Sequence, residues 1–169
     1  MPTNLELKIH LDNPARVMDN IKAINAEYKG ELNQVDVYYR YKKGLLKLRT
    51  ENGKQTLIKY NRNEKTGTRW SDYELISLEN NNAREYLDDI LETETVVEKT
   101  RQLYLFDNTR IHLDTVNNLG SFLELETLVI NGKDDAEKRF RHIIDVLELN
   151  TGSEIRKSYR DLMLEKDGR

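Results

Sequence analysis

The sequence predicts an α+β fold built on a mostly antiparallel sheet, and three observations indicate this class. Short segments of alternating polar and apolar residues recur along the chain, separated by turn residues. Three other segments carry apolar residues at helical spacing. No interdomain linker interrupts this pattern, so we expect one domain over residues 1–169 in the order β-α-βββ-β-α-βββ-α-β.

The first two elements are predicted to be a strand and a helix. Residues 4–11 alternate strictly, with every odd-numbered position apolar, which is typical of a half-buried strand. Asp12 or Asn13 can then cap a helix that carries Pro14 in its first turn. Apolar residues recur at helical spacing until Gly30, where we expect this helix to end.

Four strands are predicted next. Asn52-Gly53, between the second and third of them, is the firmest turn signal in the chain. Residues 61–68 show no periodicity, so we interpret them as an exposed, mobile hairpin loop. The four predicted strands are Val35–Tyr41, Leu45–Thr50, Thr56–Tyr60 and Trp70–Leu75.

The second half of the chain is predicted to run helix, meander, helix and tail. The two helices cover Asn82 to Leu91 and Asp134 to Leu149. The tail from Ser158 to Leu164 is apolar enough to dock as a final short element, which we assign as a strand. The three strands of the meander are Val96–Phe106, Thr109–Val116 and Phe122–Ile130.

Composition excludes several classes of protein. With 27 Lys and Arg against 30 Asp and Glu, the net charge of −3 argues against a general nucleic-acid binder. The absence of Cys excludes disulfides, thiolate metal sites and a Cys nucleophile, and it fits a reducing compartment, so we expect a cytoplasmic protein. No apolar run reaches the roughly 18 residues of a membrane span, and the opening residues resemble a strand rather than a cleavable signal.

Charged residues concentrate on one face of the predicted strands. Lys99 with Arg101, and Glu124 with Glu126, stand two residues apart, so both members of each pair project to the same side. If the sheet curls so that these faces converge, burying the charges costs several kcal/mol per unpaired ion. They must then pair with each other or with a ligand of both charges. A polyphosphate with a divalent metal has that character.

A solvated charged face is the competing interpretation. Antiparallel sheets commonly expose one face, and cross-strand salt bridges would use the same residues. Same-sign neighbours repel unless a counterion lies between them, which favours a ligand. Patterning alone leaves both interpretations open.

Other motifs carry less information. The histidines His10, His112 and His142 show no spacing typical of a zinc site, and there is no G-x-x-x-x-G-K-[ST] loop for P-loop chemistry. Several strand tyrosines could stack on a base, although such residues are more often packing residues. They are Tyr38, Tyr39, Tyr41 and Tyr104.

Over nearly its whole length the chain resembles the CYTH superfamily, the triphosphate tunnel metalloenzymes that include class IV adenylyl cyclases and thiamine triphosphatase. Asn4-Leu5-Glu6-Leu7-Lys8 is similar to the family's opening strand of alternating acidic residues ending in Lys. Leu46–Arg49, Glu98–Arg101 and Leu119–Glu126 are similar to later family segments, in the same order. Ser158–Leu162 resembles the end of the bacterial cyclase-like branch.

This resemblance implies an eight-stranded antiparallel β-barrel, the triphosphate tunnel fold, with helices packed outside. The lumen would bind a small-molecule triphosphate, such as ATP, thiamine triphosphate or tripolyphosphate, together with Mg²⁺ or Mn²⁺. From the net charge and the lack of a long apolar run we expect no nucleic-acid or membrane partner, and we expect a monomer or a homodimer.

The resemblance also implies roles for individual residues. Asn4 stands where many members have a first glutamate, which removes one carboxylate and leaves a neutral oxygen. Glu6 and Lys8 would be the catalytic pair. The implied metal ligands are Glu6, Glu74, Asp114, Glu124 and Glu126. The implied triphosphate-binding residues are Lys8, Lys47, Arg49, Lys59, Lys99, Arg101 and Arg160, with Lys157 or Arg156 as substitutes for the last.

Three functions agree with this set of residues. The leading expectation is hydrolysis of a nucleoside or organic triphosphate or of tripolyphosphate, with catalysis by positioning and charge neutralisation. The alternative is cyclisation of ATP to cyclic AMP and pyrophosphate. A non-catalytic polyphosphate- or nucleotide-binding module is the third, and the loss of the carboxylate at Asn4 motivates it.

Overall fold

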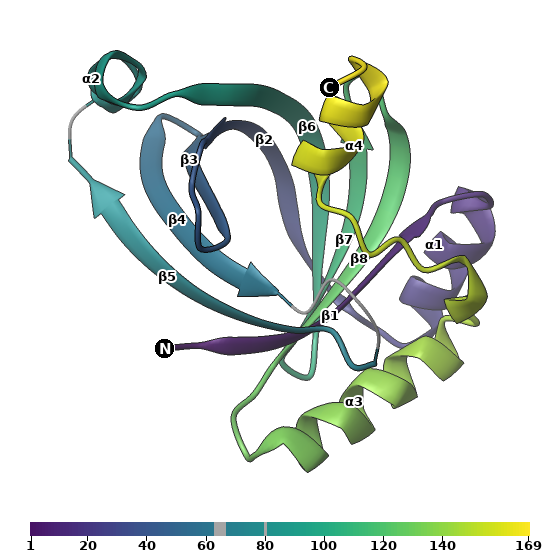
Figure 1. Cartoon of the computed structure of the whole chain (residues 1–169). Coiled ribbons are helices and arrows are strands. Elements are labelled where there is room, and N and C mark those ends of the chain that lie inside the picture. The colour runs from purple at the N-terminus through teal and green to yellow at the C-terminus, as the bar shows by residue number, and fades with distance from the viewer. Residues whose placement is uncertain (63–66, 80) are drawn as a thin grey trace.

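A computed structural model describes residues 1–62, 67–79 and 81–169 and has a closed antiparallel barrel at its centre (Figure 1). The strands are hydrogen-bonded in the order β1-β5-β4-β3-β2-β6-β7-β8, and β8 pairs with β1 to close the barrel. The predicted eight-stranded barrel is therefore confirmed. The strands are β1 Thr3–His10, β2 Glu27–Tyr39, β3 Leu45–Glu51, β4 Lys54–Arg62, β5 Trp70–Leu78, β6 Thr93–Phe106, β7 Thr109–Val116 and β8 Gly120–Leu128.

The helices pack around this barrel, as predicted (Figure 1). None of the helices within the described residues is long and apolar enough to cross a membrane. The predicted loop over residues 61–68 falls mainly on residues 63–66, which lie outside the described part, while β4 continues through Arg62. The helices are α1 Pro14–Ala23, α2 Ala83–Ile90, α3 Lys133–Val146 and α4 Tyr159–Lys166, with a 3₁₀ turn η1 at Thr151–Ser153.

The main hydrophobic core lies outside the barrel, between the sheet and two helices. Leu7 and Ile9 of β1 pack against Ile21 of α1 and Ile143 of α3, and all four side chains are buried. Each such aliphatic side chain contributes about 1.5–3 kcal/mol when it leaves water. Because side chains alternate along a strand, the neighbours of these residues on β1 point into the lumen.

The first helix is shorter than its periodicity predicts. Its start is as expected, because the Asn13 side chain accepts a hydrogen bond from the backbone N–H of Arg16 at 3.2 Å. Its end comes early, because Asn25 adopts a φ of 55°, in the left-handed region. The chain then enters β2 at Glu27, and Gly30 lies at a bulge within that strand rather than at a helix end.

The last element is a helix, and its assignment as a strand is wrong. Ser158 and Asp161 form a capping box, in which the Ser158 Oγ accepts from the Asp161 N–H at 3.1 Å and the Asp161 carboxylate accepts in return. Tyr159 and Met163 of this helix pack on the inward-facing Phe122 of β8. The C-terminal helix therefore fills one end of the barrel.

Residues 154–155, before this helix, run beside β1. Glu154 forms an isolated bridge with Ile9, and the N–H of Ile155 donates to the carbonyl of Lys8 at 2.7 Å. Arg69, which is almost fully buried, donates from its guanidinium to the carbonyls of Ile155 and Arg156. These bonds join the tail to both β1 and the start of β5.

Candidate active site

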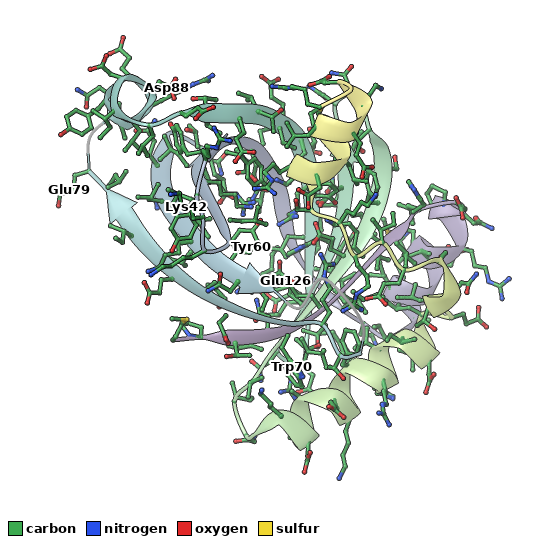
Figure 2. All side chains as sticks on the ribbon, in the orientation of Figure 1. Lys42, Tyr60, Trp70, Glu79, Asp88 and Glu126 are labelled. Carbon is green, nitrogen blue, oxygen red and sulfur yellow. The ribbon has the colours of Figure 1, made fainter. Side chains whose placement is uncertain are left out.

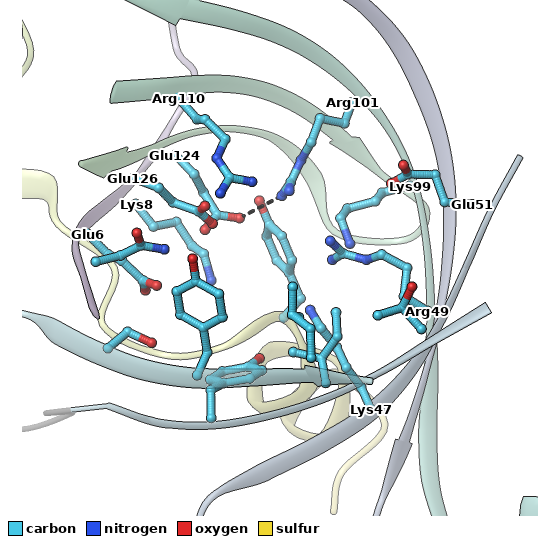
Figure 3. A pocket seen from close by; sticks show the side chains of 18 of the residues that line it. Glu6, Lys8, Lys47, Arg49, Glu51, Lys99, Arg101, Arg110, Glu124 and Glu126 are labelled. Carbon is cyan, nitrogen blue, oxygen red and sulfur yellow. Dashed lines mark hydrogen bonds and ion pairs between the residues drawn. The ribbon is translucent and has the colours of Figure 1, made fainter. Parts of the chain in front are cut away.

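The barrel encloses a cavity of about 280 Å³ (Figure 3). Figure 2 shows side chains filling the interior, Tyr60 and Glu126 among them, whereas Asp88 lies on α2, away from it. The charged residues that line the cavity include more cations than carboxylates, although the whole chain has a negative net charge. The cations are Lys8, Lys47, Arg49, Lys54, Lys99, Arg101 and Arg110, and the carboxylates are Glu6, Glu51, Glu124 and Glu126.

Most of the residues singled out from the sequence come together in this cavity, although they lie on different strands. The alternation of strands explains the convergence, because each of these residues has the parity of the inward face. Their placement is a finding, and their roles remain predictions. The residues are Glu6, Lys8, Lys47, Arg49, Lys99, Arg101, Glu124 and Glu126.

Lys59 and Glu74 do not line the cavity, and the expectation that they face the ligand is wrong. They pair with each other on the outer face of β4 and β5, with 2.8 Å between Nζ and Oε2 and about half of each side chain exposed. The physical reason is the alternation of side chains along a strand. On β4 and β5 the face that carries Lys59 and Glu74 points outward, and the face with mainly apolar and hydroxyl-bearing residues points into the cavity. Beyond Lys54 at the start of β4, the inward residues of these two strands are Thr56, Ile58 and Tyr60 on β4 and Ser71, Tyr73 and Leu75 on β5.

Arg160 also lies away from the cavity. It donates to Asp161 at 2.8 Å and pairs with Glu94 at 3.6 Å. The residue of the tail that enters the lumen is its neighbour Tyr159. The sequence contained a signal for this, because the S-x-x-D pattern at Ser158 marks a helix start and places Tyr159 in the first turn.

Asp114 is inside the barrel, where its carboxylate accepts hydrogen bonds from protein donors, and its role as a metal ligand stays a prediction. It is fully buried, and its two carboxylate oxygens accept from the Arg101 guanidinium at 2.7 Å each. The Tyr159 hydroxyl also donates to Asp114, at 2.7 Å. Burial, together with Glu124 and Asp114 nearby, raises the pKa of Tyr159 well above its ordinary value, so this hydroxyl stays a donor. The geometry assigns Asp114 to orienting Arg101 and Tyr159.

A second buried carboxylate, Asp36, was missed by sequence reasoning. It accepts from Arg49 at 2.8 and 2.9 Å, from Lys47 at 3.1 Å and from Lys99 at 2.8 Å. Burial alone would raise the pKa of Asp36, but the charges of these three cations outweigh it and hold the pKa well below its ordinary value. Asp36 is therefore ionised and surrounded by positive charge.

The side of the lumen formed by β1 and β8 is the carboxylate side, because it carries Glu6, Glu124 and Glu126 in addition to Lys8. Glu126 lies between the β1 residue Glu6 and the β7 residue Arg110 in the strand registers. Burial would raise the pKa of Glu126, but His112, Arg110 and Arg101 lower it below its ordinary value. Burial, followed by the charge of Arg101, lowers the pKa of His112 to about 4, so its imidazole is neutral at pH 7.

Lys8 joins this side of the lumen to the tail. Its Nζ donates to the carbonyl of Lys157 at 2.9 Å and lies 4.0 Å from the centre of the Tyr159 ring. Across the β1–β8 ladder Lys8 is opposite Glu124, a favourable pairing. The ammonium group is therefore fixed at the boundary between the carboxylates and the tail.

The remaining charged residues of the lining follow from the alternation of side chains along each strand. Glu51 stands two residues beyond Arg49 on β3, and Lys54 is opposite Glu51 in the hairpin register. Arg110 shares a face with His112. Selecting only the segments with family resemblance left these residues out.

The carboxylate side has the donor chemistry of a site for Mg²⁺ or Mn²⁺. Within the described residues no group of three acidic or histidine side chains forms a ready-made metal cluster. Glu6 and Glu126 are nevertheless directly opposite each other, and like charges in that register repel unless a cation lies between them. The Oδ1 of Asn4, in the same lining, is buried and has no hydrogen-bond partner in the described part of the chain. Mg²⁺ typically takes one or two carboxylates and completes its shell with water and substrate phosphates, so these oxygens fit it.

Fold and site together define an antiparallel barrel with a charged tunnel that is lined by both acids and bases. The chain belongs to the CYTH domain family, which matches residues 3–159. This confirms the resemblance inferred from the strand segments.

Known proteins agree with this assignment. A protein of Methanocaldococcus jannaschii named "Putative adenylate cyclase MJ0240" is 25% identical over 170 residues, covering 94% of this chain and 97% of that protein. The structure of PH1012 from Pyrococcus horikoshii OT3 has a TM-score of 0.83 at 22% identity, with 94% and 98% of the two chains covered. That of HpAC1 from Hippeastrum, described as a "Putative adenylyl cyclase" with a dominant triphosphatase activity, has a TM-score of 0.65 at 10% identity, covering 100% and 97%. The structural similarities support the fold.

Proposed function

We propose that the protein is a Mg²⁺- or Mn²⁺-dependent triphosphatase that hydrolyses a nucleoside or other organic triphosphate, or tripolyphosphate. The convergence of cations and carboxylates from several strands on one cavity carries this proposal. Cations that converge from several strands suit a chain of phosphate groups, and the carboxylates suit the metal that accompanies it. HpAC1, which has the same fold, is described as a triphosphatase.

The size of the cavity supports a triphosphate group as the part that enters. At about 280 Å³ it lies just below the range of about 300–1,000 Å³ that is typical of pockets enclosing drug-sized ligands. The phosphate chain would occupy the lumen, and an organic group would remain at the mouth. The inward Tyr73 and Leu75 of β5 offer that group an apolar surface.

The chain's own residues would act by positioning and charge neutralisation. Arg49, Lys47 and Lys99 would bind phosphate oxygens from one side, while Arg101 and Lys8 would face the carboxylate side. Oxygens of Glu6, Glu124 and Glu126 would hold the metal, whose positive charge lowers the charge build-up on the phosphates when it is bound. A water oxygen forms a bond to the terminal phosphorus, the bridging P–O bond breaks, and the water proton leaves to solvent or a carboxylate.

Cyclisation of ATP is the second candidate, favoured by the similarity to the Methanocaldococcus jannaschii protein named as an adenylate cyclase. The ribose 3′-oxygen would attack the α-phosphorus and pyrophosphate would leave. The same cations would bind the phosphate chain in either reaction, so only the position of the attacking oxygen differs.

Product analysis tests both. The protein is incubated with ATP, tripolyphosphate or thiamine triphosphate in the presence of Mg²⁺ and then Mn²⁺, and the products are followed by ³¹P NMR. Orthophosphate with a diphosphate product supports the triphosphatase, while cyclic AMP with pyrophosphate supports the cyclase. Tight binding of all three compounds without turnover would contradict both and leave a non-catalytic binding module.

A further inference from the structure

The Asp36 carboxylate forms a buried cluster with three cations of the cavity lining. The Asp36 side chain is completely buried, and those of Lys47, Arg49 and Lys99 are 10%, 17% and 1% exposed. All three cations line the cavity. Asp36 lies behind them on β2, opposite Arg49 in the β2–β3 register. One carboxylate therefore contacts three cations that come from two strands, β3 and β6.

Without the Asp36 carboxylate, the positive charges of Lys47, Arg49 and Lys99 would be buried together with no counterion. Burial, followed by Arg49, lowers the pKa of Lys47 to about 8. Burial, together with the charges of Arg49, Lys47 and Arg101, lowers the pKa of Lys99 to about 7 against the opposing effect of Asp36. Like charges this close repel, so the cations need an anion among them before any substrate arrives.

We propose that Asp36 is a positioning residue, a built-in counter-anion that holds the side chains of Lys47, Arg49 and Lys99 together as a preformed phosphate-binding cluster. This inference rests on the proposed function, because it gives the cluster its ligand. Arg49 is fixed most strictly, since its Nε and Nη2 each donate to one Asp36 oxygen. Its remaining guanidinium nitrogen is left to face the cavity.

Holding the three cations in place before the substrate binds should affect kcat, which a purely structural role of Asp36 would not do. Groups that are already aligned neutralise charge in the transition state without reorganisation, so loss of Asp36 lowers kcat. Removing a negative charge from a phosphate site also lowers repulsion of the ligand in the ground state. We therefore expect Asp36→Asn to lower kcat at least ~10-fold while KM stays unchanged or falls.

The pH profile gives a second readout. Lys99 faces Asp36 of β2, Lys47 and Arg49 of β3, Arg101 of its own strand and the Tyr159 ring of α4. In Asp36→Asn the only anion among these groups is lost, while burial and the three cations remain. An opposite charge at this distance changes a pKa by about 1–3 units, so the alkaline limb of kcat/KM moves at least ~1 pH unit to lower pH.

Three companion variants make the test specific. Asp36→Glu keeps the anion, so the pH profile returns toward that of the wild type. Asp36→Asn/Lys47→Met removes one cation with the anion, which relieves repulsion and keeps a folded protein available if the single variant does not fold. Asp135→Asn removes a matched carboxylate, 2.9 Å from Arg139 on α3 and outside the barrel, and leaves both kcat and the pH profile unchanged.

The experiment measures kcat, KM and the pH profile of kcat/KM with tripolyphosphate, and the titration of lysine Nζ in the ligand-free ¹⁵N-labelled protein. A shifted profile that follows a lowered lysine pKa supports the proposal. A profile of Asp36→Asn or of the double variant that coincides with that of the wild type overturns it. A wild-type protein that neither binds nor hydrolyses tripolyphosphate, ATP or thiamine triphosphate overturns the proposed function instead, so the two failures are distinguishable.

Discussion

Arg101 of β6 and Asp114 of β7 form a fully enclosed ion pair, in which the guanidinium donates to both carboxylate oxygens at 2.7 Å. The two residues are directly opposite each other in the strand register. Burial would lower the pKa of Arg101, but Asp114 and Glu124 raise it well above its ordinary value. The pair keeps a guanidinium charged deep in the lumen.

Removing one partner of this pair is expected to be costly. Asp114→Asn leaves a buried guanidinium without its main counterion, so the free energy of unfolding should fall by about 3–5 kcal/mol. Urea unfolding followed by circular dichroism measures this change. Asp72→Asn, an exposed substitution on β5, should change the free energy of unfolding by less than about 0.5 kcal/mol. Equal stability of the two variants would contradict the structural role of Asp114.

Arg49 is expected to matter for turnover rather than for folding. Arg49→Ala removes a cation of the proposed phosphate-binding cluster, and kcat/KM should fall about 100-fold, as when a single transition-state donor is lost. Thermal stability should change little, because Lys47 and Lys99 still contact Asp36 and are no longer repelled by Arg49. Arg40→Ala, an exposed control that removes an ion pair with Glu92, should retain full activity. An inactive Arg49→Ala protein that has also lost its fold would argue against this division of roles.

Lys59 provides a direct test of which face of β4 points into the barrel. Because it pairs with Glu74 on the outside of the barrel, Lys59→Ala should retain kcat/KM within about two-fold, as surface substitutions generally do. Lys47→Ala, which truncates the same side chain on the inner face of β3, should lose most of the activity. Steady-state kinetics with the same triphosphate compares the two variants. Similar losses in both would mean that Lys59 reaches the ligand after all.

The buried lysines predict that stability rises with pH. Chiefly through burial, the pKa of Lys99 is lowered to about 7 in the folded protein, from the 10.5 that is ordinary for lysine. Between these values the unfolded chain binds more protons than the folded one, so the free energy of unfolding increases as pH rises. Urea midpoints between about pH 7 and pH 9, below the range in which tyrosines titrate, isolate this effect. Lys99→Met should flatten the slope, and an equally steep slope in that variant would contradict the assignment.

Asn4 should limit metal affinity. Its Oδ1 is a neutral oxygen beside the carboxylates, so Asn4→Asp adds a charged ligand of the same size. Mn²⁺ should then bind several-fold more tightly, which electron paramagnetic resonance titration of the ligand-free protein measures. The exposed turn variant Asn118→Asp controls for net charge and should leave the affinity unchanged. Weaker Mn²⁺ binding in Asn4→Asp would place the metal elsewhere.

Strand alternation was enough to predict the barrel and most of the cavity lining. Pairs such as Lys99 with Arg101 and Glu124 with Glu126 share a face whatever the exact register, and closure of the sheet then brings them together. Alternation does not say which of two faces turns inward. On β4 the sequence offers Lys59 on one face and Ile58 on the other, and only closure of the barrel selects Ile58.

The role of Asp36 could not be predicted from its local sequence either. It stands between two valines on β2, so its segment resembles any half-buried strand with one acidic residue. Its importance comes from Lys47 and Arg49 on β3 and from Lys99 on β6, which is 63 residues away in sequence. Contacts at such separations depend on which strands become neighbours, and local pattern does not determine that.

The attachment of Lys8 to the Lys157 carbonyl and the Tyr159 ring also sets the order in which the site can be built during synthesis. β1 is made before β8 and α4, yet its charged face is completed by β8 and then by residues 157–159. A nascent chain lacking its final helix would therefore expose Lys8 and an unfilled barrel end. The proposed phosphate site should therefore be complete only after residues 157–159 have been made.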